Sequence, residues 1–514
     1  MNHAARWLKP GTWREFLIHD VGLAATFFVI GVVSRIPFRG QWLYHWDSVN
    51  FALGMERFDV RLHQPHPPGY LLYVLLGRLV NLFVGDTNAS LVWISIVFGG
   101  LTVVAVYLLG RRLFGRAEAI VAAVFVLTGP AFWFYNEVAL TYTVEAFFVT
   151  AIALACLETR RGNQRLVLVS AFLLGLAGGV RQTTLVLMLP LWLFSLWRCH
   201  WQISVAACVL LGVTVLAWLV PTVLLSGGPG PYLEASRSIG GGVLSDLELF
   251  SAGQSLLASL GPFVRLGVYL VYGLMFGLVP LLYGIVKGVG KARTWLRQWR
   301  SDTRAHVMAL WLIPNLVLYA PLVRAPGHTF SFMPALVLLA AAALVAFCRD
   351  VSGRLRVPTV GLTVSLTGLI VAVNVAFFLA APPYLFGIQR VVTTTPSWPT
   401  IHHRDRYLAG RVTYITQHFD PATTVILTAG PDYRHPDYYL RDYYALNCTA
   451  DGSLVSDAPT ESRTLVLLSD GLTSRQDGVQ AVVLPDGEVL RYLQLYADSE
   501  IVVDQFDVSV RPRS

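Results

Sequence analysis

Two short stretches near residue 50 contain the side chains best suited to chemistry. The first reads His45-Trp46-Asp47-Ser48, and the second reads Gln64-Pro65-His66-Pro67-Pro68-Gly69-Tyr70. Both follow directly after the first apolar run that is long enough to cross a membrane. An acidic residue on the far side of a membrane, inside a multi-spanning chain, indicates chemistry as well as anchoring. Asp47 is therefore the first candidate for a general base.

The residues after Asp47 have the spacing of a partly amphipathic helix over 47–58. One stripe holds Asp47, Asn50, Gly54 and Arg57, and a neighbouring apolar stripe holds Phe51, Met55 and Phe58. We expect this helix to lie on the membrane surface, with the Asp47 carboxylate at the edge of the apolar stripe. Asp47 also suits a helix N-cap because it precedes the apolar periodicity. The position alone leaves both roles open.

The second stretch predicts a rigid entry into the next helix. Pro67 and Pro68 remove two backbone donors and fix an extended turn, and Gly69 allows close approach of a ligand or another backbone. Three nearby histidines, His45, His63 and His66, offer metal ligands. A loop with the pattern HxxH and no third ordered ligand is a weak metal signal, so we expect no metal and no other cofactor.

The composition is that of a membrane protein. Of 514 residues, 55% are hydrophobic and 14% are charged, and the mean hydropathy is +0.56. Ordinary soluble domains carry about 25% charged residues. Mainly apolar runs of about 18 residues or more recur through the first three quarters of the chain, which is typical of a polytopic helical membrane protein.

The end of the chain differs in charge and in pattern. Residues 385–514 hold 11 Arg, no Lys and 16 Asp plus Glu, a net charge of −5, whereas the whole chain is +8 and residues 1–384 are +13. Strand-like runs at 424–428, 464–468 and 481–484, with a helical segment after Pro436, favour a small α/β domain. We therefore predict a transmembrane domain over 1–384 and a soluble α/β domain over 385–514.

The charged loops decide how many apolar runs cross the membrane. Twelve runs are present, but twelve spans would place the basic loop Arg111–Arg116 outside and the acidic loop Gly85–Asn88 inside. Basic residues belong on the cytoplasmic side. Treating residues 68–85 as an in-plane or re-entrant helix removes this conflict. We predict about eleven spans plus in-plane helices.

The same arrangement of spans and loops predicts where the protein resides. The first apolar run follows a polar lead that contains Arg6, Lys9 and Arg14, and we interpret it as an uncleaved helix whose N-terminus is cytoplasmic. We therefore expect a multi-pass protein of the plasma (inner) membrane with an extracytoplasmic C-terminal domain. The basic loop 287–304 then follows the positive-inside rule and is no nucleic-acid patch.

These features together carry a family resemblance. An acid in the first outer loop, an in-plane helix and the entry His66-Pro67-Pro68-Gly69-Tyr70 resemble the GT-C glycosyltransferases, and most of all the bacterial protein O-mannosyltransferase-like group. The stretch Gly175–Gln182, and Pro326-Gly327-His328 followed by Phe332 and Pro334, are similar to further parts of such proteins. The resemblance covers residues 15 to about 350 in layout. Its most specific part is the His-Pro-Pro-Gly entry.

The resemblance implies a reaction. Such enzymes transfer a sugar from a polyprenyl-phosphate donor to an acceptor hydroxyl on the extracytoplasmic face, with inversion. Asp47 would be the general base, and His66, Tyr70 and His328 would contact substrate. The acceptor would be a lipid, a protein or a polysaccharide, and membrane lipid would surround the spans.

A phosphate leaving group needs cations. Candidates are Arg57, Arg61, Arg78, Arg181 and Arg324, because guanidinium pairs well with phosphate oxygens. Arg181 and Arg324 rank first because both fall at the predicted outer ends of apolar helices. Arginines at such positions also snorkel to lipid headgroups, which is the competing explanation.

A second acid is expected at the turn after the third span. Glu137 lies at this turn, whereas Tyr142 occupies the position nearest the family's usual Asp, and Glu145 lies about two helical turns deeper than Glu137. We predict that Glu137 orients substrate hydroxyls, although a Glu at a helix start also complements the helix dipole.

Two other classes of function remain open from the sequence. A lipid-linked glycan transporter or flippase would place ionisable groups at mid-depth in its spans, and a non-catalytic envelope-assembly protein would tolerate replacement of Asp47. Most acids gather at one predicted face, which favours the enzyme, with Glu145 as the exception.

Overall fold

The computed structural model describes residues 12–237, 256–289, 302–323, 325–385, 387–388, 391–392, 394–449, 451–485, 487–496 and 499–512. The chain divides into two compact units. Unit 1 comprises Met1–Arg39, Asp59–Arg61 and Pro67–Thr400, and unit 2 comprises Gly40–Phe58, Leu62–His66 and Ile401–Ser514. Each unit is described by itself.

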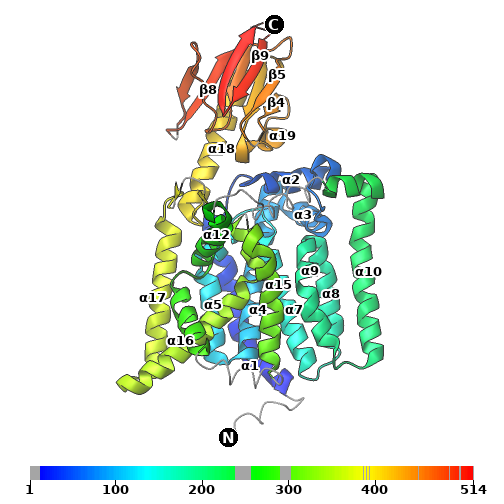
Figure 1. The fold of residues 1–514 in the computed structure, drawn as a ribbon, viewed down its shortest axis with the longest axis vertical. Helices are drawn as coiled ribbons and strands as arrows, with labels where there is room; N and C mark the ends of the chain where they lie inside the picture. The colour runs from blue at the N-terminus through cyan, green and yellow to red at the C-terminus, as the bar shows by residue number, and fades with distance from the viewer. Residues whose placement is uncertain are drawn as a thin grey trace. The chain divides into compact units, whose positions relative to one another are not determined.

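Unit 1 is a bundle of apolar helices (Figure 1). Its helices are α1 (Thr12–Val33), α3 (Leu71–Val84), α4 (Thr87–Leu113), α5 (Arg116–Thr128), α6 (Pro130–Asn136), α7 (Tyr142–Arg160), α8 (Leu166–Val180), α9 (Gln182–Leu196), α10 (Trp201–Leu225), α12 (Leu256–Leu274), α13 (Leu278–Val289), α15 (Thr303–Leu322), α16 (Met333–Leu355) and α17 (Thr359–Ala380). Short 3-10 turns are η2 (Ile36–Phe38), η5 (Met275–Gly277) and η6 (Pro326–Ser331), and β1 (Gly387–Ile388) pairs with β2 (Val391–Val392). The turn η3 (Val60–Leu62) has residues of both units.

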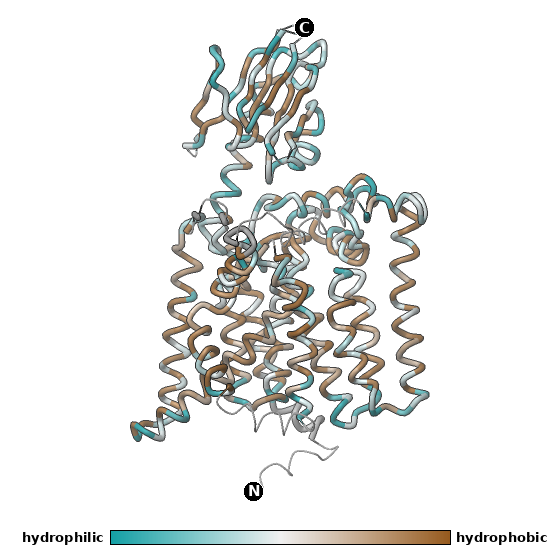
Figure 2. The backbone as a smooth tube through the Cα atoms, in the orientation of Figure 1, coloured by the Kyte–Doolittle hydropathy of each residue, from teal (hydrophilic) through white to brown (hydrophobic). Residues whose placement is uncertain are grey.

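The bundle has the dimensions of a multi-pass membrane protein. Within the described residues, eight helical segments are long and apolar enough to cross a membrane, and α5 with α6 forms a further broken span bent by 56°. The helices α8 and α9 are apolar but shorter, with 15 residues each. Eight or nine segments thus meet the length and hydropathy of a span, and the predicted count of eleven, which requires α8 and α9 as well, stays a prediction. Figure 2 shows hydrophobic residues along the middle of the bundle and hydrophilic residues toward its ends.

The predicted in-plane run is the short helix α3. It has 14 residues, about 21 Å at 1.5 Å per residue, which is less than the ~30 Å of a hydrocarbon core. Figure 1 shows α3 at one end of the bundle, where it packs on α4 and α8. Residues 229–237 are helical too. The rest of the loop, residues 238–255, lies outside the described residues.

Ion pairs to buried carboxylates link helices at the other end of the bundle. Arg112 pairs with Glu158 at 2.5 Å, and Arg349, which is 58% exposed, pairs with Glu118 at 2.6 Å. Both acids are buried, Glu118 in the first turn of α5 and Glu158 near the end of α7. Acids within the helices are therefore matched by arginines of neighbouring helices.

Unit 2 has three layers, which are the helix α18, a five-stranded sheet and a three-stranded sheet. A five-stranded sheet has the order β4-β3-β6-β8-β7, and a three-stranded antiparallel sheet has the order β10-β9-β5. The strands are β3 (Thr424–Thr428), β4 (Tyr444–Asn447), β5 (Leu454–Asp457), β6 (Thr464–Leu467), β7 (Gln480–Val483), β8 (Val489–Gln494), β9 (Ser499–Asp504) and β10 (Asp507–Pro512). The helices are α2 (Trp46–Glu56), α18 (Trp398–His418, which begins in unit 1) and α19 (His435–Tyr439), with turns η7 (Pro421–Thr423) and η8 (Gly430–Asp432).

Alternation along the buried strands builds two cores. Val425 and Leu427 face the three-stranded sheet, where they pack with Ile501 and Val503. Ile426 faces the opposite way and belongs to a cluster with residues of α18. Successive side chains of a strand point to opposite faces, and β3 is buried along its whole length because both of its faces are covered. The α/β character expected for the end of the chain is thus present.

The helix predicted over 47–58 exists as α2, but its surroundings were predicted wrongly. We expected an apolar stripe of Phe51, Met55 and Phe58 resting on the membrane surface. These three side chains are buried in the folded chain, and so is every residue from Ser48 to Met55. A helix buried on several sides presents no free apolar stripe to lipid.

Candidate active site

Asp47 lies in the first turn of α2 but does not cap it. The N-cap residue is His45, whose Nδ1 accepts the Asp47 backbone N–H at 3.2 Å, and the Ser48 hydroxyl accepts the His45 N–H at 3.4 Å. This reciprocal pair satisfies two of the helix's unpaired donors. The N-cap of α2 is therefore His45, and the alternative reading of Asp47 as the N-cap is wrong.

Two imidazoles flank the Asp47 carboxylate. His66 Nδ1 lies 3.3 Å from Oδ1, and His45 Nδ1 lies 3.5 Å from Oδ2. Because His45 Nδ1 accepts an N–H, it presents a lone pair and cannot also donate to the carboxylate. The Asp47 side chain is 20% exposed and that of His66 is 16% exposed. The Asp47 carboxylate is thus mostly enclosed but keeps some exposure.

Unit 2 places His66 beside Asp47 through a close backbone contact. Gly54 of α2 faces the segment Gln64–Pro65, and a Cβ on Gly54 would lie 2.9 Å from Pro65 Cδ and 3.1 Å from the Gln64 carbonyl carbon. The His66 ring also packs on Phe51, with ring centroids 5.6 Å apart. His66, predicted as a substrate contact, therefore lies against the candidate base.

Unit 1 contains a second polar cluster, centred on Arg181. Arg181 links α8 to α9, and its Nε lies 3.0 Å from Glu145 Oε2. Its Nη1 donates to the Thr141 hydroxyl at 3.1 Å, and the Thr184 hydroxyl donates to Glu145 Oε1 at 2.7 Å. The Glu145 side chain is fully buried and that of Arg181 is 10% exposed. The arginine is thus held in place by a buried carboxylate.

Aromatic rings surround this arginine. The Arg181 guanidinium carbon lies 4.8 Å from the centroid of the Tyr142 ring, and the His328 ring lies 6.1 Å from Tyr142 and 5.5 Å from Tyr319. Gly327 makes this packing possible, because a Cβ there would lie 2.3 Å from the Tyr142 ring. The cluster combines a cation with flat apolar surfaces, which suits a phosphate joined to a sugar.

Tyr70 belongs to the same unit as this cluster. It precedes α3 with a left-handed backbone, φ 52°, a conformation that costs a non-glycine residue about 1–2 kcal/mol. The Tyr70 phenol interacts electrostatically with Arg181. Two of the predicted site residues, Tyr70 and His328, thus belong to the cluster around Arg181, which was itself predicted.

Glu137 lies at the predicted turn, and its proposed role in orienting substrate hydroxyls stays a prediction. Its side chain is 0% exposed, in the turn after α6, and its electrostatic partner is Arg35. The Arg35 guanidinium in turn stacks over Trp133 at 4.5 Å. Glu145, which the sequence analysis only noted, is the acid that touches Arg181. No spacing pattern in the sequence links Glu145 to Arg181, because the two residues lie 36 positions apart, with most of α7 and the whole of α8 between them.

The remaining candidate cations fall in several places. Arg61 forms a two-pronged pair with Asp59, with Nε to Oδ1 at 2.9 Å and Nη2 to Oδ2 at 2.6 Å. Arg57 ends α2 and is exposed, and Arg78 lies on α3 with partial exposure. Arg324 lies outside the described residues. Within the described part of the chain, no group of three or more His, Cys, Asp or Glu has the arrangement to hold a metal ion.

A family model matches part of the chain. Residues 58–205 match the model described as the protein O-mannosyl-transferase TMEM260 N-terminal domain. The matched range contains His66, Tyr70, Glu137 and Arg181, and it begins after Asp47. The match confirms the predicted resemblance to protein O-mannosyltransferases over these residues. Together with the spans, it supports a membrane glycosyltransferase.

Two solved structures are distantly similar in fold. ArnT from Cupriavidus metallidurans, in a crystal structure bound to undecaprenyl phosphate, is 13% identical over 85% of this chain and 86% of that chain, with a TM-score of 0.49. The apo oligosaccharyltransferase of Archaeoglobus fulgidus is 14% identical over 83% of this chain and 64% of that chain, with a TM-score of 0.48. No feature of the site is inferred from likenesses this distant. No curated protein matches the chain.

Proposed function

We propose that this chain transfers a sugar from a polyprenyl-phosphate-linked donor to an acceptor hydroxyl on the extracytoplasmic face of the plasma membrane, with inversion at the anomeric carbon. The observation that carries this proposal is the Asp47 carboxylate, which lies in the first turn of α2, flanked by His45 and His66 and partly exposed. The family match over residues 58–205 supports the reaction class.

The proposed reaction is a single displacement. The acceptor oxygen attacks the anomeric carbon while Asp47 takes the hydroxyl proton, a role that contributes about 10²–10⁴-fold. The bond between the anomeric carbon and the phosphate oxygen breaks, and its electron pair leaves with the polyprenyl phosphate. Attack from the side opposite the leaving group inverts the anomeric configuration.

Arg181 is the proposed partner of the leaving phosphate. Glu145 and Thr141 hold its guanidinium on two sides, so little conformational freedom is lost when an anion binds. Tyr142, Tyr319 and His328 supply flat surfaces around it. Arg324, Arg57 and Arg78 remain further candidates for phosphate contacts, Tyr70 and His328 for sugar contacts, and Glu137 for orienting hydroxyls.

The transporter alternative gains no specific support. It needs ionisable groups at mid-depth, and Glu145 was the residue that suggested one. Glu145 lies in the first turn of α7 and is paired with Arg181, so it belongs to a helix-end cluster.

The test compares purified wild type with Asp47→Asn in detergent. Each protein is incubated with a panel of polyprenyl-phosphate sugars and an envelope extract as acceptor, and released polyprenyl phosphate is followed by mass spectrometry. We expect release by wild type and a loss of about 10²–10⁴-fold in Asp47→Asn. Asp86→Asn is the matched control, because Asp86 is an exposed cap of α4 and Asn caps equally well. Turnover retained in folded Asp47→Asn would remove Asp47 as the base.

A further inference from the structure

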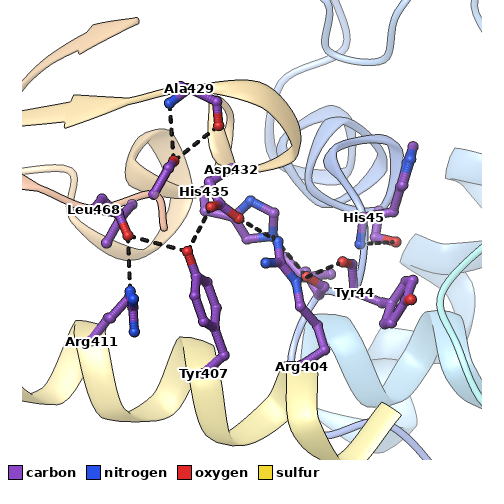
Figure 3. A network of polar contacts seen from close by, with 12 residues as sticks. Tyr44, His45, Arg404, Tyr407, Arg411, Ala429, Asp432, His435 and Leu468 are labelled. Atoms are coloured by element: carbon purple, nitrogen blue, oxygen red, sulfur yellow. Dashed lines mark hydrogen bonds and ion pairs between the residues drawn. The ribbon is translucent and has the colours of Figure 1, made fainter. Parts of the chain in front are cut away.

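The candidate base lies in the same compact unit as the C-terminal domain, although more than 350 residues separate them in sequence. The segment Gln41–Tyr44, which leads into α2, is bound by α18 and α19 through its backbone. Figure 3 shows part of this network, with Arg404 and His435 reaching toward the loop that contains Tyr44.

Three successive backbone donors of the segment are taken up by side chains of the C-terminal domain. The N–H groups of Gln41 and Trp42 donate to the two carboxylate oxygens of Asp405, at 2.9 and 3.0 Å. The Leu43 N–H donates to the Tyr439 hydroxyl at 2.9 Å. The Tyr439 ring also packs on Trp42, with centroids 4.6 Å apart.

Two successive backbone carbonyl groups of the segment also accept hydrogen bonds from side chains of the C-terminal domain. His435 Nε2 lies 2.9 Å from the Leu43 carbonyl oxygen, and Arg404 Nε donates to the Tyr44 carbonyl at 3.2 Å. A carbonyl only accepts, so the His435 proton lies on Nε2. Burial, together with the Arg404 charge, lowers the pKa of His435 to about 4, so this ring is neutral near pH 7.

The groups that bind the segment are themselves held in the domain. Arg404 pairs with the buried Asp432 at 2.7 Å, and the Tyr407 hydroxyl donates to the other Asp432 oxygen at 2.8 Å. Asp432 follows β3, at the carboxyl ends of the parallel strands β3, β4 and β6. Open α/β sheets bind ligands at this edge. Here the chain's own segment Gln41–Tyr44 lies at this edge of the sheet and contacts His435, which follows β3, and Arg404, which pairs with Asp432.

Further contacts hold α2 along its length. Arg434 Nε donates to the Asn50 side chain at 2.8 Å, and Arg441 forms a two-pronged pair with Glu56 at 2.6 and 2.8 Å. The Trp46 ring packs against Tyr433, with centroids 5.7 Å apart. The start, middle and end of α2 are therefore each bound by residues 433–441.

We infer that the C-terminal domain positions the candidate base: it binds the backbone of Gln41–Tyr44 and the length of α2, and so fixes where the Asp47 carboxylate points. This inference rests on the proposed function of Asp47. Asp405, Tyr439, Arg404 and Arg434 are positioning residues, because none of them touches Asp47 or a substrate. A misplacement of about 1 Å costs up to ~10²-fold in rate, so loosening these contacts impairs the chemical step.

The experiment uses the full-length double variant Asp405→Asn, Tyr439→Phe. It removes one oxygen acceptor for the paired N–H groups of Gln41 and Trp42 and the acceptor for Leu43. The matched control is Asp477→Asn, Tyr496→Phe, two exposed residues of the same domain. Hydrogen exchange of residues 41–56 is measured by mass spectrometry, and kcat and KM are measured with a polyprenyl-phosphate sugar.

We expect exchange over 41–44 to rise about tenfold, the size of one lost hydrogen bond to a charged acceptor. We expect kcat to fall about 10- to 100-fold, with an unchanged KM for the donor, and no effect in the control. A second variant, Arg434→Lys, loosens α2 at Asn50 and is expected to lower kcat in the same way. It keeps the inference testable if the double variant does not fold.

Two results would overturn the inference. One is unchanged exchange over 41–56, which would mean that the domain does not hold the segment. The other is faster exchange with unchanged kcat, while Asp47→Asn is inactive. That result would mean that the contacts to Gln41–Tyr44 and α2 do not affect the action of Asp47 as the base. Wild type that releases no polyprenyl phosphate from any donor counts against the proposed function, and the exchange measurement still decides whether the domain holds the loop.

Discussion

Among single residues, the pairing of Arg181 with Glu145 complicates the test of the leaving-group assignment. The Glu145 side chain is fully buried and Arg181 is nearly so. Removing one member of such a pair leaves an uncompensated buried charge, which costs about 3–5 kcal/mol. A loss of activity in Arg181→Ala would therefore mix a folding defect with lost phosphate binding.

Neutralising both partners separates the two effects. We expect Arg181→Gln to lower the unfolding free energy by about 3–5 kcal/mol, and the double variant Arg181→Gln, Glu145→Gln to recover most of that loss. Donor affinity should remain low in both, because neither has a cation for the phosphate. Thermal unfolding and binding of a labelled polyprenyl-phosphate sugar measure the two quantities.

The control for this prediction is a second buried pair in the same bundle. Arg112 and Glu158 are 16% and 5% exposed and lie 2.5 Å apart, at the helix ends where α4 and α7 finish. Arg112→Gln should destabilise the protein without changing donor affinity. If the double variant of Arg181 and Glu145 binds donor as tightly as wild type, Arg181 does not hold the phosphate.

Among secondary-structure elements, the contact between α2 and the segment Gln64–Pro65 sets the distance from Asp47 to His66. Gly54 lies where these elements touch, and its neighbours there are backbone and proline ring atoms that cannot rotate away. A single methyl group at this point must move one element relative to the other.

Gly54→Ala is therefore expected to lower activity. In a helix, Ala is normally favoured over Gly by about 1 kcal/mol, but overpacking costs about 1–3 kcal/mol, and here the two elements carry the candidate base and its histidine. We expect a net loss of stability and a fall in turnover, measured by thermal unfolding and by polyprenyl phosphate release. Gly212→Ala in α10, where a Cβ meets nothing within 4 Å, should be neutral or stabilising. Full activity in Gly54→Ala would show that the spacing of Asp47 and His66 is not critical.

The contact between α18 and the first loop predicts a pH dependence. Burial raises the pKa of Asp405 from 3.8 to about 6, although the Gln41 and Trp42 N–H groups and the Arg404 charge oppose this shift. A carboxyl whose pKa is raised on folding contributes stability below its unfolded pKa, and that contribution is lost as pH rises through the folded value. The advantage of wild type over Asp405→Asn in unfolding midpoint should therefore shrink from about pH 4 to pH 7. A constant difference across this range would contradict the raised pKa.

For the whole molecule, the elements that the sequence predicted are those whose signal is local. A membrane span needs only a continuous apolar run, so the spans and the short helix α3 were readable from hydropathy and loop charge. The strand β3 was predicted over 424–428 and is found there. The helix α18 was not predicted, although Ile401, Leu408, Val412 and Ile415 recur at helical spacing and are buried.

Contacts between distant residues left no trace in the sequence. The pairs Gln41–Asp405, Leu43–Tyr439 and Asn50–Arg434 join residues more than 350 positions apart. Nothing in the spacing of either stretch indicates its partner. Asp47 was therefore recognisable as a candidate from its type and position, whereas what holds it and which acid touches Arg181 required the fold.

Membrane topology is the last expectation that follows from the whole chain, and α4 is the helix that decides it. It has 27 residues, about 40 Å in length, which exceeds the ~30 Å of a hydrocarbon core. Its two ends must therefore lie on opposite sides of the membrane. Eleven spans place the residues before α4 outside, whereas twelve spans place them inside. Asn88 is a poor reporter because it is buried at 7% exposure, but Val84 and Ala117, which flank α4, are exposed.

Single cysteines at these two positions, in a background without the five native cysteines, test the topology directly. In intact cells, we expect an impermeant thiol reagent to label Val84→Cys and to label Ala117→Cys only after permeabilisation, since the basic residues around Ala117 favour the cytoplasm. The opposite labelling would restore the twelve-span arrangement. α3 would then be a span with its two ends on different sides, and the residues before α4 would be cytoplasmic. Because α1 comes first in either arrangement, the loop that contains Asp47 is expected outside in both, so the labelling decides the number of spans and leaves the side of transfer unchanged.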